Sequence, residues 1–138
     1  MSNADFPVVI FHNPACGTSR NVVAMVEAAG YTPSVIAYLQ AGWTHEQLKD
    51  LAREAGVTLR DLMREKGSPA AELGLLEAGA TEAQILDAMV EHPILVNRPI
   101  VVTPKGVALC RPSERVYALL DKAPETFTKE DGEVVTRE

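Results

Sequence analysis

The sequence predicts an α/β fold, a mixed β-sheet flanked by helices with a helical insertion, and three observations support this prediction. The chain has 138 residues, and a single domain usually takes roughly 100–200. Hydrophobic residues make up 46% and charged residues 23%, which is ordinary for a protein with a packed core. Short β-branched runs lie towards both ends, while the segment between them follows helical periods. We therefore expect one domain over residues 1–138, with the insertion at about 44–93 and a charged tail at about 121–138.

The N-terminal segment predicts a strand, a helix and a second strand. Residues 8–11 form an apolar, β-branched run that ends at polar residues, as a buried strand does. A helix predicted from Ser19 has one apolar stripe, formed by Val22, Met25, Val26 and Ala29. Gly30 stands where a C-terminal glycine cap belongs. Residues 34–39 are the second strand candidate, so this part of the chain predicts a βαβ unit.

The insertion is predicted to be mainly helical. A capping-box pattern at Thr44 precedes an apolar stripe, and a second one at Thr81 starts another helix that ends before Pro93. Between them, Thr58 is expected to begin a further helix, and a short piece at 71–76 follows it.

The C-terminal segment predicts a hairpin and a last helix. Strands at 100–103 and 107–110 flank a Pro-Lys-Gly turn, and Ser113 can cap the helix. The tail beyond Asp121 is expected to be weakly ordered, with a frayed helix at 129–136. The complete element order is that of a thioredoxin-like fold with a helical insertion.

Charge and cysteine content exclude several classes of protein. The formal net charge is −6, whereas nucleic-acid binders usually carry a basic surface. No apolar run approaches the roughly 18 residues of a membrane span, and residues 1–5 lack the features of a secretion signal. Two cysteines are too few for a secreted disulfide framework. We therefore expect a cytoplasmic protein that binds neither nucleic acid nor membrane.

Cys16 is the strongest candidate for a reactive group. It lies between a predicted strand and a helix start, where free backbone N–H groups and the helix dipole stabilise a thiolate. Gly17 lets a ligand approach the backbone, and Thr18, Ser19 and Arg20 add donors, so the turn is a plausible anion cradle. The alternative is a buried structural cysteine, but so many polar donors around one thiol favour reactivity.

The residues that follow Cys16 argue against two classes of thiol enzyme, the dithiol oxidoreductases and the cysteine phosphatases. Ser19 occupies the position at which a dithiol enzyme carries its resolving cysteine, so this thiol has to be resolved from outside, by glutathione or another protein. A cysteine phosphatase loop needs an arginine about five residues after the cysteine, and Arg20 comes too early. Cys110 could pair with Cys16, but its place in an apolar strand favours a buried thiol.

The histidines give weaker signals. His12 can lower the pKa of the thiol as a cation or a hydrogen-bond donor, or it can simply bond to the backbone, and both alternatives stay open. His45 and His92 lie at helix ends and are interpreted as structural. No Cys/His spacing indicates a metal site, and no bound cofactor is expected.

Two arginines are candidate anion ligands. Arg98 and Arg111 each precede a proline at one end of the predicted hairpin, and guanidinium groups bind tetrahedral oxyanions bidentately. Pro99 fits the cis-proline position of a thioredoxin-like fold, which would place Arg98 next to Cys16. For Arg64 the residues alone leave the question open. The remaining arginines of interest are interpreted as solvated surface charges: Arg53, Arg60, Arg115 and Arg137.

Four segments resemble the glutaredoxin-coupled arsenate reductases, in the same order along the chain from about Val8 to Leu120: residues 12–21, 72–75, 92–102 and 109–114. The resemblance implies a thioredoxin-like fold that reduces arsenate to arsenite, with glutathione as co-substrate and glutaredoxin as partner. The residues that match the family's functional positions are the nucleophile Cys16, the assisting His12, the oxyanion-binding Arg64, Arg98 and Arg111, and the cis-proline Pro99.

Two other functions remain possible at this stage. A relative with the same fold could be a thiol- or glutathione-dependent reductase of another substrate. A non-enzymatic relative could bind RNA polymerase, although such proteins typically carry a second cysteine where this chain has Ser19.

Overall fold

The computed structural model describes residues 6–136, so the expectations for residues 1–5 and Arg137 lie outside the described residues. The chain divides into two compact units, each described by itself. The first, here called the sheet unit, consists of residues 1–37 and 98–138. The second, the helical unit, consists of residues 38–97; it contains the whole of the expected insertion and extends beyond it at both ends.

The sheet unit contains the predicted mixed sheet. Its strands are β1 (Val9–His12), β2 (Ser34–Ala37), β3 (Ile100–Thr103) and β4 (Gly106–Leu109), in the order β2-β1-β3-β4. β1 and β2 are parallel, because a helix crosses over between them, whereas β3 is antiparallel to both β1 and β4. The predicted thioredoxin-like arrangement is thereby confirmed.

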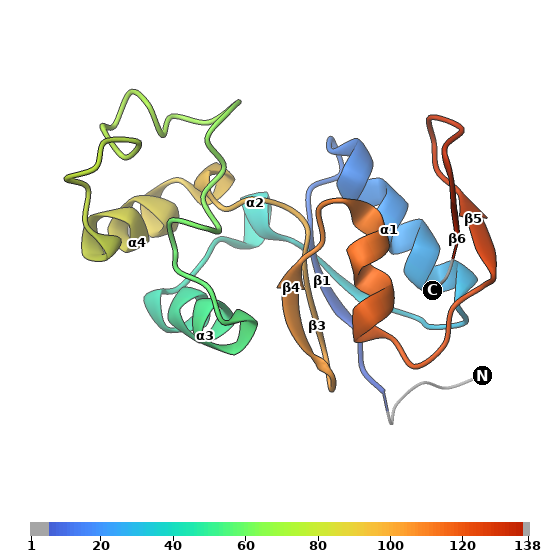
Figure 1. Ribbon diagram of the computed structural model, residues 1–138. Helices are drawn as coiled ribbons and strands as arrows, with labels where there is room; N and C mark the ends of the chain where they lie inside the picture. Colours follow the sequence, from blue (N-terminus) through green and yellow to red (C-terminus); the bar gives the residue numbers. More distant parts are fainter. Residues whose placement is uncertain (1–5, 137–138) are drawn as a thin grey trace. The chain divides into compact units, whose positions relative to one another are not determined.

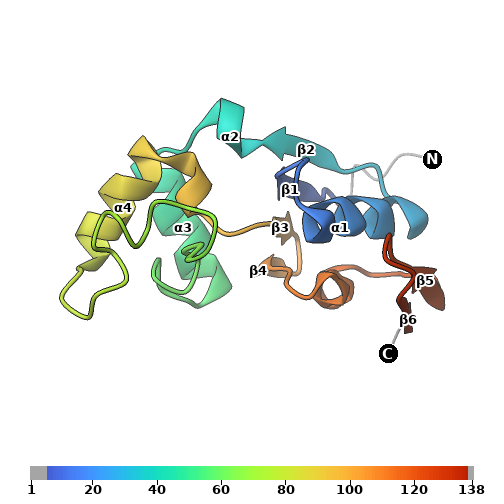
Figure 2. The same cartoon turned by 90° about the horizontal axis from the view of Figure 1, so that it is seen from above.

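Two helical elements cover one face of this sheet (Figures 1 and 2): α1 (Gly17–Ala28) and the 3₁₀ helix η2 (Ser113–Leu119). Their apolar side chains and those of the sheet form one core, which includes Ile10, Val22, Met25, Val26, Val101, Cys110, Val116 and Leu119. This packing fixes the start of α1 against the end of β1, where Cys16 lies. The predicted last helix is present, but as a 3₁₀ helix.

The helical unit contains two longer helices, α3 (His45–Ala55) and α4 (Glu82–Glu91), with the short helices α2 (Tyr38–Ala41) and η1 (Pro93–Leu95). Both predicted capping boxes are present, at Thr44 and Thr81. Within residues 6–136, no helix is long and apolar enough to cross a membrane.

The helix expected from Thr58 does not form, and turns take its place. Thr58 and Asp61 do exchange two hydrogen bonds of the kind that caps a helix, at 3.0 and 3.1 Å. However, the backbone N–H of Arg64, which a helix would direct to the preceding turn, donates instead to the carbonyl of Leu95 at 2.7 Å. An antiparallel bridge at Met63 continues this pairing, so long-range backbone bonds override the local helical pattern.

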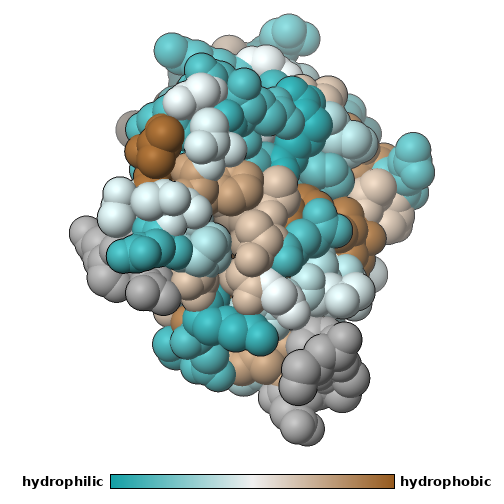
Figure 3. Space-filling view, turned by 90° about the vertical axis from the view of Figure 1, so that its right-hand side faces the viewer, coloured by the Kyte–Doolittle hydropathy of each residue, from teal (hydrophilic) through white to brown (hydrophobic). Residues whose placement is uncertain are grey.

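The tail is a β-hairpin, so the expected weak order and frayed helix are wrong. β5 (Thr126–Thr128) pairs antiparallel with β6 (Val134–Thr136). Val135 is buried in the core, and Phe127 packs against it, so alternating β-branched and aromatic residues outweigh the charges between them. Figure 3 views the sheet unit from the side of this hairpin, where hydrophilic residues mix with small apolar patches.

Candidate active site

Cys16 is the N-cap of α1, directly after the loop that follows β1. Its backbone is extended, its own N–H donates to the carbonyl of Asn13 at 3.0 Å, and its carbonyl accepts from the N–H of Arg20 at 3.0 Å. The first N–H groups of a helix, here those of Gly17, Thr18 and Ser19, have no partner within it, and the N–H of Ser19 hydrogen bonds to the thiol. The residue is only 7% exposed.

Ser19 and Asn13 hold the loop together from inside. The Ser19 hydroxyl, fully buried, accepts from the N–H of Asn13 at 3.1 Å and lies 2.6 Å from Nδ1 of His12. Asn13 Oδ1 accepts from the N–H of Ala15 at 2.9 Å. Ser19 is predicted to be an anion ligand together with Gly17. Its hydroxyl is bound within the loop, so its backbone N–H is the group that contacts the thiol.

Arg98 and Arg111 converge on the thiol. Nη1 of Arg111 lies 3.6 Å from the sulfur of Cys16 and donates to the carbonyl of Arg98 at 3.1 Å. The Arg98–Pro99 peptide bond is cis, as the sequence analysis expects. The Arg111–Pro112 bond is also cis, which no pattern in the sequence indicated. The pairing of β3 with β4 brings both arginine segments to one end of the sheet.

Opposing influences act on the acidity of Cys16. Burial raises the pKa of the thiol, but the backbone N–H of Ser19, the charge of Arg98, and the hydrogen bond and charge of Arg111 all lower it. The lowering influences prevail, so the pKa of Cys16 lies below its ordinary value. A lowered pKa increases the fraction of Cys16 that is present as the nucleophilic thiolate.

His12 is not arranged to act as a cation. Burial, and then the charge of Arg20, lower the pKa of its imidazole. Its Nδ1 hydrogen bonds to the Ser19 hydroxyl, which is a side-chain partner and not the backbone partner expected as the alternative, and the lowered pKa favours a neutral imidazole.

Cys110 is buried like Cys16, but its environment shifts the pKa of the thiol in the opposite direction. Its side chain is completely buried, and burial raises the pKa of its thiol to about 12. Both cysteines are free thiols. The interpretation of Cys110 as structural agrees with this environment.

Arg64 belongs to the helical unit. Its Nε donates to the carbonyl of Lys66 at 2.8 Å, its guanidinium lies against Gly67, and its carbonyl accepts from the Ser68 hydroxyl. The site residues predicted from the sheet unit therefore come together within that unit, and Arg64 is placed on a turn of the other.

The interpretation of Arg60 as a solvated surface charge is wrong. Its guanidinium donates to three backbone carbonyls, those of Leu75, Glu77 and Ala80, at 2.7–3.4 Å. It therefore holds the turns before α4. Arg53 matches the expectation, since it forms an exposed ion pair with Asp50.

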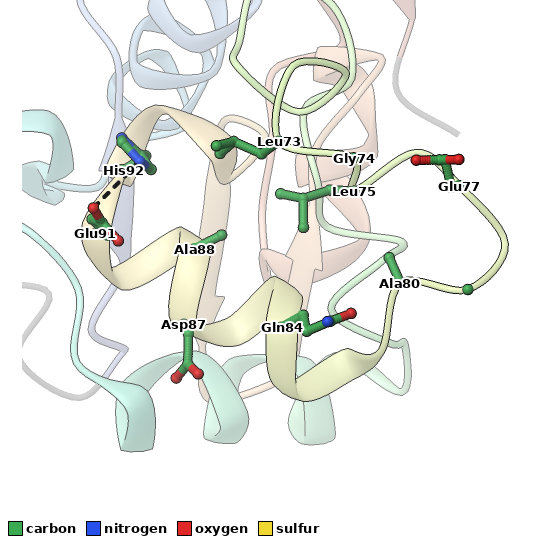
Figure 4. Close-up of a pocket in the computed structure, with 11 residues that line it drawn as sticks. Leu73, Gly74, Leu75, Glu77, Ala80, Gln84, Asp87, Ala88, Glu91 and His92 are labelled. Carbon is green, nitrogen blue, oxygen red and sulfur yellow. Dashed lines mark ion pairs between the residues drawn. The ribbon is translucent and has the colours of Figure 1, made fainter.

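A pocket in the helical unit lies between those turns and α4 (Figure 4). Exposed carboxylates of Glu77, Asp87 and Glu91 stand around it, and an ion pair joins Glu91 to His92 at 3.8 Å. None of the predicted site residues lines it. Among the described residues, no group of three or more His, Cys, Asp or Glu side chains could hold a metal ion.

One contact near the site joins residues that are far apart in the sequence. Arg20 forms a bidentate ion pair with Glu130, both bonds at 2.9 Å, and donates from Nη1 to the carbonyl of Pro14 at 2.8 Å. The partners lie 110 positions apart, so no local spacing could have indicated the pair.

Comparisons of the sequence and of the structure with known proteins all match arsenate reductases or their family. The model of the ArsC family matches residues 11–119. An arsenate reductase of Synechocystis sp., ArsI2, is 62% identical over 132 residues, covering 95% of this chain and 94% of the relative. The arsenate reductase of Escherichia coli K12 is 48% identical with the same coverage. The structure of an arsenate reductase from Vibrio cholerae aligns with a TM-score of 0.79 at 39% identity, covering 83% of this chain and 98% of that one.

Proposed function

The chain belongs to the ArsC family, and on that premise we propose that it is an oxidoreductase that reduces arsenate to arsenite, with glutathione and glutaredoxin supplying the electrons. The observation that carries this function is the acidic thiol of Cys16 beside Arg111 and Arg98. Arsenate is a tetrahedral oxyanion, and the guanidinium groups can both bind it and stabilise the charge that develops when the thiolate attacks.

Arg64 is the third arginine of the proposed oxyanion site. This role rests on the match of its position to the family's motif. Within its own unit, the Arg64 guanidinium is held by the turn at Lys66 and Gly67. The proposed ligands of arsenate are therefore Arg64, Arg98 and Arg111, with the backbone N–H groups of Gly17, Thr18 and Ser19.

The reaction starts with attack of the Cys16 thiolate on arsenic, with loss of water, which forms a sulfur–arsenic(V) bond. The thiol of glutathione then adds to arsenic, and a second water leaves. A glutaredoxin thiolate attacks the glutathione sulfur, and the electron pair of the breaking sulfur–arsenic bond passes to arsenic. Arsenic(V) is thereby reduced to arsenic(III), while the two outside thiols are oxidised to a mixed disulfide. Water finally hydrolyses the remaining bond, frees arsenite and restores Cys16.

External thiols are required because the chain offers no internal one. Ser19 stands where a resolving cysteine would lie, and the Cys110 thiol is buried with a pKa of about 12. Glutathione and reduced glutaredoxin are available in a reducing compartment, which supports a cytoplasmic location.

His12 is proposed to assist Cys16 indirectly. Through Nδ1 it fixes the Ser19 hydroxyl, which in turn binds the N–H of Asn13 and holds the loop that presents the thiol. A neutral imidazole can fill this role, and burial and the charge of Arg20, which lower the pKa of His12, favour the neutral form.

The test is steady-state arsenate reduction by the purified protein with glutathione and glutaredoxin, each omitted in turn. We expect turnover only in the complete mixture, and little activity when a small disulfide replaces arsenate. Arsenate reduction without glutathione would contradict the proposed electron route. Faster reduction of the disulfide than of arsenate would support the alternative, a general thiol reductase.

A further inference from the structure

The turn of the β5–β6 hairpin reaches both segments that carry the site. Lys129 forms an ion pair with Glu114, at 2.8 Å, in the helix that follows Arg111, and its side chain is only 9% exposed. The next residue, Glu130, binds α1 instead: its carboxylate pairs with Arg20, and its backbone N–H donates to Asn21 Oδ1 at 3.0 Å. Adjacent hairpin residues therefore attach to the two sides of the site.

The guanidinium of Arg20 is fixed on two edges. Nε and Nη2 donate to the two oxygens of Glu130, while Nη1 donates to the carbonyl of Pro14. A fork held this way has one orientation, because both carboxylate oxygens and the carbonyl must be met at once. The pair also lies beside Gly17, since a Cβ built there would be 3.7 Å from Nη2 of Arg20 and 3.9 Å from the Glu130 carboxylate.

The hydrogen bond from Arg20 to the Pro14 carbonyl restrains the loop that leads to Cys16. The peptide unit between Pro14 and Ala15 lies one residue before the peptide that enters Cys16. Its carbonyl accepts from Arg20, and its N–H donates to Asn13 Oδ1 at 2.9 Å. With both groups occupied, this peptide cannot rotate without breaking a hydrogen bond, so the loop enters α1 in one conformation.

We propose that Glu130 is a positioning residue for the nucleophile: it holds Arg20 so that Arg20 fixes the Pro14 carbonyl and, through it, the loop that presents Cys16. The proposal rests on the proposed function only in naming the reaction that benefits. The position of the thiol can be measured without arsenate, so a failure of arsenate turnover in the wild-type protein would leave this proposal testable.

Two effects of Glu130 act on Cys16 in opposite directions. As a charge, Glu130 offsets the positive field of Arg20, so its removal would lower the thiol pKa further. As a positioning residue, it keeps the helix start in order, so its removal would weaken the N–H contacts that stabilise the thiolate and raise the thiol pKa. The direction of the change therefore separates a positioning role from a purely electrostatic one.

The first test is Glu130→Gln, with the pKa of Cys16 measured from the pH dependence of alkylation by iodoacetamide. We expect that pKa to rise by about half a unit and kcat/KM for arsenate to fall by roughly three- to tenfold. Asp121→Asn is the matched control, because the Lys105–Asp121 pair is a similarly exposed ion pair of the same unit, and it should change neither quantity. An unchanged or lowered thiol pKa in Glu130→Gln would overturn the proposal.

The second test exchanges the partners in the double variant Arg20→Glu/Glu130→Arg. This variant can rebuild the ion pair, but a carboxylate at position 20 has no hydrogen to donate to the Pro14 carbonyl. We therefore expect its thiol pKa to stay at least as high as that of Glu130→Gln. If the exchange restores the wild-type pKa and activity, the ion pair alone is sufficient and the positioning role through Pro14 is wrong.

Discussion

The loop that carries Cys16 and the strand end that carries Cys110 both bury their thiols, with exposures of 7% and 0%, yet they change thiol acidity in opposite directions. At Cys110 burial dominates and the pKa rises to about 12. At Cys16 the same cost of burial is exceeded by a helix start and two arginines, and the pKa falls. Burial alone therefore says little about whether a cysteine is reactive; the fixed dipoles and charges around it decide.

The largest effect on activity is expected when the sulfur of Cys16 is removed. Cys16→Ser should abolish glutathione-dependent arsenate reduction, because a serine hydroxyl is not ionised under these conditions and is a far weaker nucleophile. The measurement is steady-state turnover, with folding checked by circular dichroism. If Cys16→Ser keeps substantial activity, the assignment of the nucleophile is wrong.

A smaller effect is expected from Arg111→Lys, which keeps the charge near Cys16 but removes the guanidinium fork. A lysine cannot reach the sulfur and the Arg98 carbonyl in the same planar geometry. We expect kcat/KM for arsenate to fall by roughly ten- to a hundredfold and the pKa of Cys16 to rise. Wild-type kinetics in this variant would show that charge alone is enough at position 111.

The comparison also predicts opposite pH dependences of stability. The folded state lowers the pKa of Cys16, so this thiol stabilises the fold above its unfolded pKa, and the contribution is lost as pH falls through the folded pKa. For Cys110 the folded pKa is raised, so stability is lost as pH rises from the ordinary thiol pKa towards about 12.

Thermal unfolding of Cys16→Ser and Cys110→Ser from pH 7 to 10 tests whether the two thiols change stability in opposite directions. Relative to the wild type, Cys16→Ser should lose stability and Cys110→Ser should gain it as pH increases. Parallel curves for the two variants would mean that the thiols do not differ in the folded state.

The smallest effect on activity is expected from Cys110→Ser at neutral pH. Its thiol is buried and protonated, and its sulfur donates only weakly, to the Ala108 carbonyl at 3.8 Å. Activity should stay within about twofold of the wild type, while burial of a hydroxyl costs about 1 kcal/mol of stability if that bond is kept. A large loss of turnover would instead indicate an internal disulfide in the cycle.

The parts predicted correctly from the sequence are those fixed by neighbouring residues. The strand–loop–helix around Cys16, the hairpin of β3 and β4, and the two capping boxes depend on short apolar runs, turns and polar caps. The place of Arg98 was predicted from the cis-proline position of Pro99, and the pairing of β3 with β4 brings Arg111 to the same end of the sheet.

The parts predicted wrongly depend on distant partners. The pattern at Thr58 is a valid helix start, but backbone bonds to residues 95 and 97 use groups that a helix would need. The tail is charged enough to suggest weak order, yet Phe127 and Val135 reach the core of the sheet unit. Arg60 resembles any surface arginine until three carbonyls surround it. In each case the deciding contact joins residues that a local window cannot compare.

The span of the Arg20–Glu130 pair has a consequence for biosynthesis. The loop around Cys16 is synthesised before the hairpin that anchors Arg20, because Glu130 lies 110 positions after Arg20. Until the hairpin has been made, the nascent chain therefore carries its nucleophile in a loop that lacks the Glu130 anchor of Arg20. On this view, full reactivity of the thiol begins only once the hairpin has docked, which delays modification of Cys16 until the protein that surrounds it is in place.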